Sequence, residues 1–253
     1  MMGLRAQKQN GFSLIELMLA LVTGLLLMIG AIQVLLASKA TFRTNEDVAR
    51  IQENGRFAIN ILARGVRMAG YREPGNGDLP NLFFTDACDT HDPCTANGAT
   101  TDSDRIAVQY DPTDDVDCFG NAVGANDVLA HLYRIVTVNG VNSLTCRSWN
   151  STTDAWVSVE RPLIDGIDGM QVLYGLRSAA GAGVTRYVSG DNVADWALVK
   201  AVRIAILVSK GTANGQAEEQ IRNYVLLDSP ILAFDDQHSR RVYSTTVMLN
   251  NAT

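Results

Sequence analysis

Residues 11–38 read GFSLIELMLALVTGLLLMIGAIQVLLAS, and this stretch decides the fold class. From Leu17 to Ser38, a run of 22 residues, no side chain carries a formal charge. A helix of that length rises about 33 Å, which matches the hydrocarbon thickness of a bilayer. Arg5 and Lys8 precede the run, and the positive-inside rule keeps such a basic leader in the cytoplasm. The sequence therefore predicts a transmembrane helix near the N-terminus.

A cleaved secretory signal peptide, cut near Ser38-Lys39-Ala40, is the alternative for this stretch. The apolar run is longer than the roughly 7–15 residues of the apolar h-region of a signal peptide. Glu16 stands at the front of the run, where a carboxylate costs on the order of 2–3 kcal/mol unless it has a partner. In a helix that began at Phe12, the dipole would favour this anion, and a free Phe12 amine would supply a cation. Such an amine requires cleavage between Gly11 and Phe12.

The segment Gly11-Phe12-Ser13-Leu14-Ile15-Glu16-Leu17-Met18 resembles the cleavage and methylation motif of type IV prepilins. In that family a membrane peptidase cuts after the glycine and methylates the new N-terminal phenylalanine. The glutamate pairs with the terminal amine of a neighbouring subunit during assembly. The resemblance implies these roles for Gly11, Phe12 and Glu16.

Residues 39–73 continue the helical pattern as an amphipathic helix, which should end at Gly70-Tyr71-Arg72-Glu73-Pro74 because proline disfavours a helical residue before it. The face expected to pack on the protein's own sheet contains Val48, Ile51, Ala58, Leu62 and Val66. A second apolar stripe lies off that face and consists of Phe57, Ile61 and Met68. This stripe is either the edge of a wide core or a surface that contacts other subunits, and we carry the subunit interface forward as the hypothesis. Four glycines in the helix allow close packing or local melting: Gly24, Gly30, Gly55 and Gly65.

Residues 74–253 change to a β pattern, which predicts an α+β fold of the type IV pilin kind, with the long helix across an antiparallel sheet. Residues 75–104 are expected to form a surface loop, and Ser178–Gly183 a hairpin tip. Asn139-Gly140 predicts a tight hairpin turn, and Ala201–Leu207 a central strand covered on both faces. The expected strands are Arg105–Tyr110, Val128–Val138, Ser143–Trp149, Ala155–Val159, Met170–Leu176, Arg186–Ser189, Leu198–Ser209, Arg222–Leu227 and Arg241–Leu249.

The four cysteines indicate an oxidising compartment and two disulfides. Three pairings are open; the short spacings favour Cys88–Cys94 and Cys118–Cys146. A metal site at Cys88, His91 and Cys94 is the alternative, but its spacing fits zinc poorly, so we expect no metal and no cofactor. The acidic run 111–117 lacks the spacing of a calcium loop and is expected to be solvated.

Composition and motifs argue against an enzyme and against a nucleic-acid binder. No phosphate loop, dinucleotide fingerprint, nucleophile elbow or zinc-protease motif is present in the sequence. Residues 74–253 carry 12 basic and 22 acidic side chains, which would repel a phosphate backbone.

Three C-terminal segments extend the resemblance to the PilW family of minor pilins: Ile164–Gly175, Val199–Ile204 and Arg241–Asn250. This implies a minor pilin that helps start assembly of a type IV pilus and sits at or near its tip. The implied partners are a prepilin peptidase, other minor pilins and the major pilin, the inner-membrane assembly platform and membrane lipid. The implied location is the inner membrane with a periplasmic C-terminal domain, and then the pilus fibre.

The expected organisation is a leader at 1–11, a transmembrane helix at 12–38, an amphipathic helix at 39–73 and a periplasmic domain at 74–253. Two rival functions remain open at this point. The first is a J-type minor pseudopilin of type II secretion. The second is a membrane-anchored periplasmic sensor or binding protein, which would need neither the cleavage nor Glu16.

Overall fold

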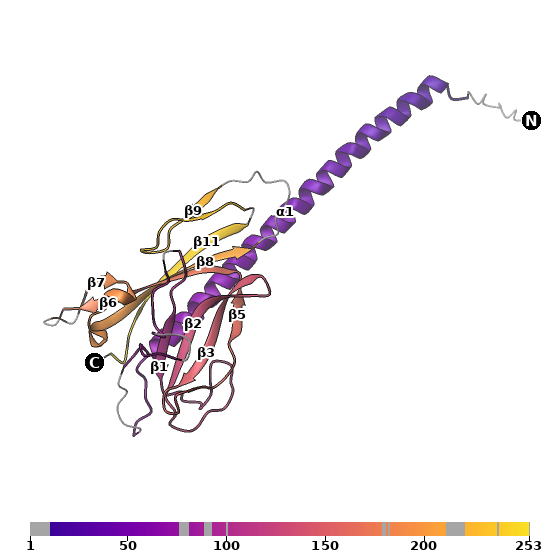
Figure 1. Ribbon diagram of the computed structural model, residues 1–253. Helices are drawn as coiled ribbons and strands as arrows, with labels where there is room; N and C mark the ends of the chain where they lie inside the picture. The colour runs from indigo at the N-terminus through magenta and orange to yellow at the C-terminus, as the bar shows by residue number, and fades with distance from the viewer. Residues whose placement is uncertain are drawn as a thin grey trace, which may run out of the picture. The chain divides into compact units, whose positions relative to one another are not determined.

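In the computed structural model, one long helix is followed by antiparallel β-sheets (Figure 1). The structure describes residues 11–75, 81–88, 93–99, 101–178, 181, 183–210, 221–236 and 238–252. The chain divides into two units, one ending at Glu46 and the other beginning at Asp47, and each is described by itself. The expected α+β fold, a long helix packed on antiparallel sheet, is confirmed.

The helix α1 spans Leu14–Met68 and ends where the sequence predicts. Gly70 follows with a φ of +72°, a left-handed conformation that glycine adopts without strain. Its N–H donates to the Gln109 carbonyl at 2.9 Å. The Asn251 side chain donates to the Ala69 carbonyl at 3.0 Å, so the C-terminus of the chain also caps the helix. At the other end α1 begins two residues after Phe12.

The strands form two larger sheets and a small ribbon, in which every pair is antiparallel. The strands are β1 (Ile106–Tyr110), β2 (Leu129–Val138), β3 (Val141–Asn150), β4 (Ala155–Trp156), β5 (Arg161–Asp165), β6 (Ile167–Arg177), β7 (Val184–Val188), β8 (Val199–Lys210), β9 (Arg222–Tyr224), β10 (Leu232–Phe234) and β11 (Ser239–Met248). The first sheet has the order β1-β2-β3-β4, with β5 also paired to β3; the second has the order β11-β8-β6-β7; β9 and β10 form the ribbon. Two 3₁₀ turns, η1 (Gly190–Asn192) and η2 (Trp196–Leu198), precede β8.

The expected strands are present, with boundaries that differ by a few residues, and the Asn139-Gly140 turn joins β2 to β3. Both turn residues have positive φ, 51° and 79°, as a tight hairpin of this type requires. Two short strands, β5 and β10, were not predicted. Each is only a few residues long, and β5 contains a proline, Pro162, which weakens the strand signal. Three residues of the expected hairpin tip, 179, 180 and 182, lie outside the described residues.

The buried face of α1 packs against both sheets. Ile51, Ala58, Leu62 and Val66 are at most 4% exposed and share one core cluster with residues of β2, β3, β6 and β8. Val48 was expected on this face, but it is 40% exposed, so that expectation is wrong. Ile51 is the first buried residue of the helix, because the core does not reach the turn that precedes it.

Two of the helix glycines are explained by aromatic rings from different sheets. A Cβ at Gly55 would lie 2.4 Å from the Tyr243 ring of β11. A Cβ at Gly65 would lie 3.0 Å from the Tyr133 hydroxyl oxygen of β2. Both positions have to be small because a ring fills the space of the missing side chain, and local melting is not needed to account for them.

Strand β8 is covered on both faces, as its continuous apolar run predicts. Val202, Ile204 and Ile206 point into the main core, whereas Ala205 and Leu207 pack under the β9–β10 ribbon.

The expectation that residues 75–104 form a surface loop is wrong in part. Phe83 is 1% exposed, and its ring packs in the main core. Cys88 and Cys94 are also fully buried, so the described parts of this segment, 81–88 and 93–99, contribute side chains to the core.

A buried arginine ties the ribbon to the second sheet. Arg240 of β11 donates to Asp168 of β6 at 2.6 Å and to both carboxylate oxygens of Asp236, at 2.5 and 2.7 Å. Its guanidinium carbon lies 3.8 Å from the centre of the Phe234 ring in β10. The hydrogen bond from Arg240 lowers the pKa of Asp236 to about 2, so the pair stays ionised at neutral pH.

Candidate functional site

The cleavage motif lies immediately before α1 and is open to solvent. Gly11, Phe12 and Ser13 belong to no helix or strand, and Phe12 is 85% exposed. The first helical hydrogen bond runs from the Leu17 N–H to the Ser13 carbonyl at 3.1 Å, which places Glu16 in the first turn. A carboxylate there is favoured by the helix dipole. The basic leader falls in residues 1–10, outside the described part of the chain.

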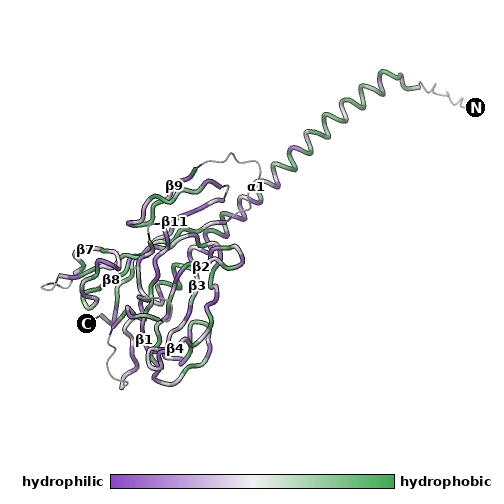
Figure 2. Tube along the Cα trace, viewed as in Figure 1, coloured by the Kyte–Doolittle hydropathy of each residue, from purple (hydrophilic) through white to green (hydrophobic). Residues whose placement is uncertain are grey.

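The N-terminal part of α1 is suited to lipid by its surface. Residues 14–46 are all exposed, and in Figure 2 most residues along the N-terminal part of this helix have the colour of hydrophobic residues. By length and composition, α1 is the one helix among the described residues that could cross a membrane. The Thr23 hydroxyl donates to the Leu19 and Ala20 carbonyls, at 2.9 and 3.1 Å. Its polar atom is therefore satisfied within the helix, as the interior of a bilayer requires.

A groove between α1 and the first sheet contains all three residues of the second apolar stripe. Its volume is about 570 Å³, and Phe57, Ile61 and Met68 line its helical wall. The stripe is not uniform: Phe57 is 60% exposed, whereas Ile61 and Met68 are half-buried. Ile61 also packs against the main core. The structure therefore brings the three residues together, with Phe57 as the most exposed of them.

The opposite wall of the groove was not predicted from the sequence. Tyr110 of β1 and His131 of β2 lie there, with the Tyr110 hydroxyl 2.9 Å from His131 Nδ1. Tyr133, which contacts the helix at Gly65, completes this wall. Burial lowers the pKa of His131 to about 4 and raises that of Tyr133 to about 12, so both are neutral near pH 7. The sequence signal that could have indicated this contact is the glycine within the helix, which leaves room for an aromatic residue of a strand.

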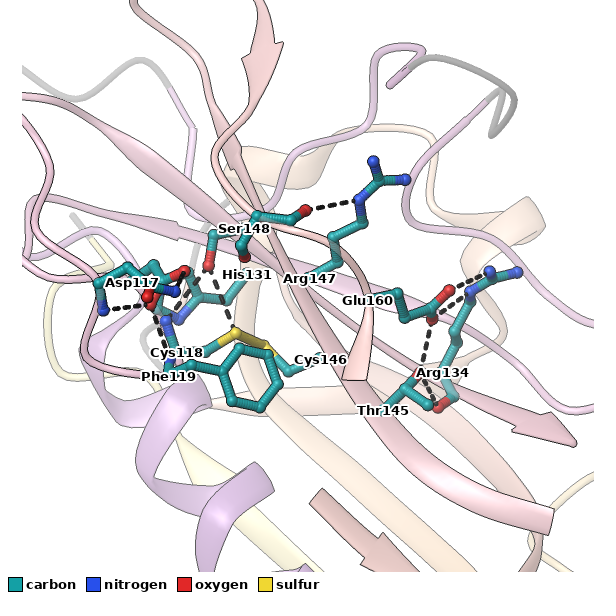
Figure 3. The surroundings of a disulfide bond; sticks show 12 residues. Asp117, Cys118, Phe119, His131, Arg134, Thr145, Cys146, Arg147, Ser148 and Glu160 are labelled. Atoms are coloured by element: carbon teal, nitrogen blue, oxygen red, sulfur yellow. Dashed lines mark hydrogen bonds and ion pairs between the residues drawn. A yellow bond between two sulfur atoms is a disulfide. The ribbon is translucent and has the colours of Figure 1, made fainter. Parts of the chain in front are cut away.

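Both disulfides lie within the unit that begins at Asp47, which we call the β unit. They join the pairs that the spacing favours. Cys118 is bonded to Cys146, and Cys88 to Cys94. Figure 3 shows the first of these beside His131 and Ser148, whose hydroxyl lies 3.4 Å from Cys118 Sγ. Because Cys88 and Cys94 are bonded to each other, they are not metal ligands in this structure; His91 lies outside the described residues.

In the acidic run 111–117, the last carboxylate forms hydrogen bonds within its own loop. The Asp117 side chain accepts hydrogen bonds from the backbone N–H groups of Phe119 and Asn121, at 2.8 and 2.9 Å, and from the Asn121 amide at 2.8 Å. These bonds lower the pKa of Asp117 although burial opposes them. Asp111 and Asp117 are only 2% and 4% exposed, so the expectation of a solvated acidic loop is wrong for these two residues, whereas Asp114 is exposed.

Comparison with known proteins places these features in one family. The family model described as type IV pilus-assembly protein W matches residues 132–251, and the prokaryotic N-terminal methylation motif matches residues 6–32. A search of curated proteins finds no match. Among solved structures, the chain is similar to a type IV-like pilin, TTHA1219, from Thermus thermophilus, with 15% sequence identity and a TM-score of 0.49, over 80% of this chain and 98% of that one.

The two family matches coincide with the two parts of the structure described above. The methylation motif covers the exposed segment before α1 and the apolar part of the helix, and the other match extends from β2 through β11. Together the two matches, over residues 132–251 and 6–32, support a type IV minor pilin of the PilW family.

Proposed function

We propose that this minor pilin is cut between Gly11 and Phe12, methylated on the new Phe12 amine, and then helps to start assembly of the filament at or near its tip. The observation that carries the proposal is the position of the motif. Gly11 and Phe12 precede the first turn of α1, and apart from its chain neighbours no described residue has an atom within 4 Å of a Cβ placed on Gly11. A peptidase can therefore reach this bond without unfolding the protein.

The proposed organisation follows the ranges expected from the sequence: a leader at 1–11, a membrane helix at 12–38, its amphipathic continuation at 39–73 and a periplasmic domain at 74–253. A prepilin peptidase and the inner-membrane assembly platform would act on the chain while it is in the membrane. Other minor pilins and the major pilin would then contact it in the fibre. The disulfides in the β unit support an oxidising compartment for that unit.

Mass spectrometry of the mature N-terminus tests the cleavage. We expect a first peptide that starts with N-methylated Phe12. A mature chain that starts at Thr41 would instead indicate a signal peptidase, and one that still starts at Met1 would indicate no processing. Either result would contradict the proposal.

Substitution of Glu16 tests its role in assembly. Glu16→Ala should leave the chain processed and bound to membrane but reduce its incorporation into filaments, because the Phe12 amine of a neighbouring subunit loses its partner. Glu16→Asp should have a milder effect. Glu53→Ala is the matched control, since Glu53 is an exposed carboxylate of the same helix beyond the apolar run. Equal incorporation of the Glu16→Ala and wild-type chains would refute the pairing.

The groove beside Phe57, Ile61 and Met68 is our proposed contact surface for another pilin. Phe57 is the exposed anchor of this surface, and an aromatic side chain of that exposure can bury a large apolar area at low entropic cost. Arg64 of the helix and Asp114 of the loop stand at the same groove and offer charges of both signs to a partner.

A further inference from the structure

Three side chains that favour soft metals meet at the wall of the groove. The ligand atoms of Cys118, His131 and Cys146 all lie within 4.8 Å of one another, and this is the one such group found among the described residues. Cys118 lies within the loop between β1 and β2, whereas His131 and Cys146 come from the neighbouring strands β2 and β3. In the β2–β3 register, Tyr133 is opposite Cys146 and Ser148 is opposite His131, so His131 and Cys146 are diagonal neighbours. The sheet itself therefore holds two of the three groups in place.

His131 has a nitrogen that the fold does not use. The residue is 2% exposed, and its Nδ1 is 2.9 Å from the Tyr110 hydroxyl. Its Nε2 is buried and has no hydrogen-bond partner among the described residues. A buried polar atom without a partner costs about 1–3 kcal/mol, so its presence requires an explanation. With Nδ1 held by Tyr110, Nε2 is the nitrogen left for a metal, and a hydrogen bond on the second ring nitrogen is the usual support for a metal-bound histidine.

The two sulfurs beside His131 form the disulfide that solvent can reach. Cys118 is half-buried and lines the groove, whereas Cys146, Cys88 and Cys94 are fully buried. A dithiol reductant can therefore attack Cys118 Sγ. The attack forms a mixed disulfide and releases Cys146 as a thiolate, which takes a proton. The second thiol of the reductant then closes the reductant's own disulfide and releases Cys118, so two electrons and two protons pass to the protein.

We propose that, once this disulfide is reduced, Cys118, Cys146 and His131 bind a thiophilic divalent cation of the Zn²⁺ class. Two thiolates and one neutral imidazole are a three-residue zinc set that leaves a fourth position for a small ligand from the groove. Binding displaces the two thiol protons. The same three residues are thus either a disulfide beside a histidine or a metal site, according to the redox state of the chain. This departs from the sequence-based expectation of no metal, and does so for the reduced chain alone.

Cobalt spectroscopy of the full chain in detergent tests the proposal. The chain is reduced with a dithiol, freed of reductant without oxygen, and titrated with Co²⁺ and then Zn²⁺. We expect one Co²⁺ per chain, thiolate-to-cobalt charge-transfer bands in the near ultraviolet, and loss of those bands when Zn²⁺ displaces the cobalt. Cys88→Ser with Cys94→Ser should keep the bands, whereas Cys118→Ser with Cys146→Ser should abolish them.

His131→Gln separates a three-ligand site from two loose thiols. It should weaken Co²⁺ binding by at least about tenfold, because one of three protein ligands is lost. Binding that is unchanged in His131→Gln, or that survives in the Cys118→Ser and Cys146→Ser chain, would overturn the proposal. So would a reduced wild-type chain that keeps its native circular dichroism without charge-transfer bands, or one that unfolds and is not refolded by Zn²⁺.

Discussion

Truncation of Leu62 and of Phe57 distinguishes the core face of α1 from its proposed contact face. Leu62 is 1% exposed and belongs to the core cluster that joins the helix to both sheets. Leu62→Ala removes the transfer free energy of the lost methyl groups and leaves a cavity, which together cost about 2–5 kcal/mol. For a unit of about 200 residues, each kcal/mol lowers the melting temperature by about 2–4 °C, so we expect a drop of roughly 4–20 °C.

Phe57→Ala should behave differently in the same chain. Phe57 is 60% exposed, so its truncation removes little buried area and should change the free energy of unfolding by no more than about 1 kcal/mol. It should instead weaken co-purification with other minor pilins, because the anchor of the groove is lost. Asn60→Ala is a control for this second readout, since Asn60 is also exposed and lines the groove but offers no apolar anchor.

Thermal unfolding of the oxidised full chain in detergent, followed by near-ultraviolet circular dichroism, measures the first effect. The β unit contains all three tryptophans and all seven tyrosines, so this signal reports its packing. A Phe57→Ala chain that melts as low as Leu62→Ala would refute the reasoning. Both apolar stripes would then be core, and the contact surface would have to lie on the sheets or loops.

Two further predictions concern close packing and pH. Gly55→Ala should destabilise the β unit by about 1–3 kcal/mol in thermal unfolding, because the new Cβ meets the Tyr243 ring at 2.4 Å; Gly24→Ala, with no atom within 4 Å of its Cβ, should not. The pKa of the buried His131 is about 4 in the folded chain against 6.5 in the unfolded chain. Its contribution to stability is therefore present above pH 6.5. On the order of 3 kcal/mol of that stability is lost as the pH falls to 4. Burial raises the pKa of Asp104 to about 6, and its contribution has the opposite sign, being lost as pH rises from about 4 to 6. Denaturant titrations at pH 6.5 and pH 4 should therefore show that His131→Gln gains stability relative to wild type on acidification. An equal pH dependence of the free energy of unfolding in the two chains would contradict this.

Much of the fold follows from local patterns. The end of α1 was predicted because Gly70 and Pro74 act on the backbone at their own positions. The Asn139-Gly140 hairpin was predicted because both residues tolerate positive φ. Most strands were predicted for a similar reason, since alternation and β-branched residues act over a few neighbours.

Periodicity failed where the answer depended on position along the helix. Val48 lies on the same angular face as Leu62, yet it is 40% exposed and Leu62 is 1% exposed. The helical repeat specifies the angle around the axis and says nothing about where the core ends along it. Phe83 shows a limit of composition. The polar composition of residues 75–104 suggested a loop, although the Phe83 ring reaches the main core.

Local sequence patterns are enough to predict a membrane-length helix, a prepilin motif before it and a β-rich domain with two disulfides after it. Each of these rests on residues that are close together in the chain or on composition. Two contacts depend on the folded chain: Phe57 borders a groove with Tyr110, and His131 lies beside the Cys118–Cys146 disulfide. Those neighbours are 13 to 53 residues apart in the chain. They meet because the β2–β3 register and the packing of α1 on the first sheet bring them together, and neither is encoded by any local repeat.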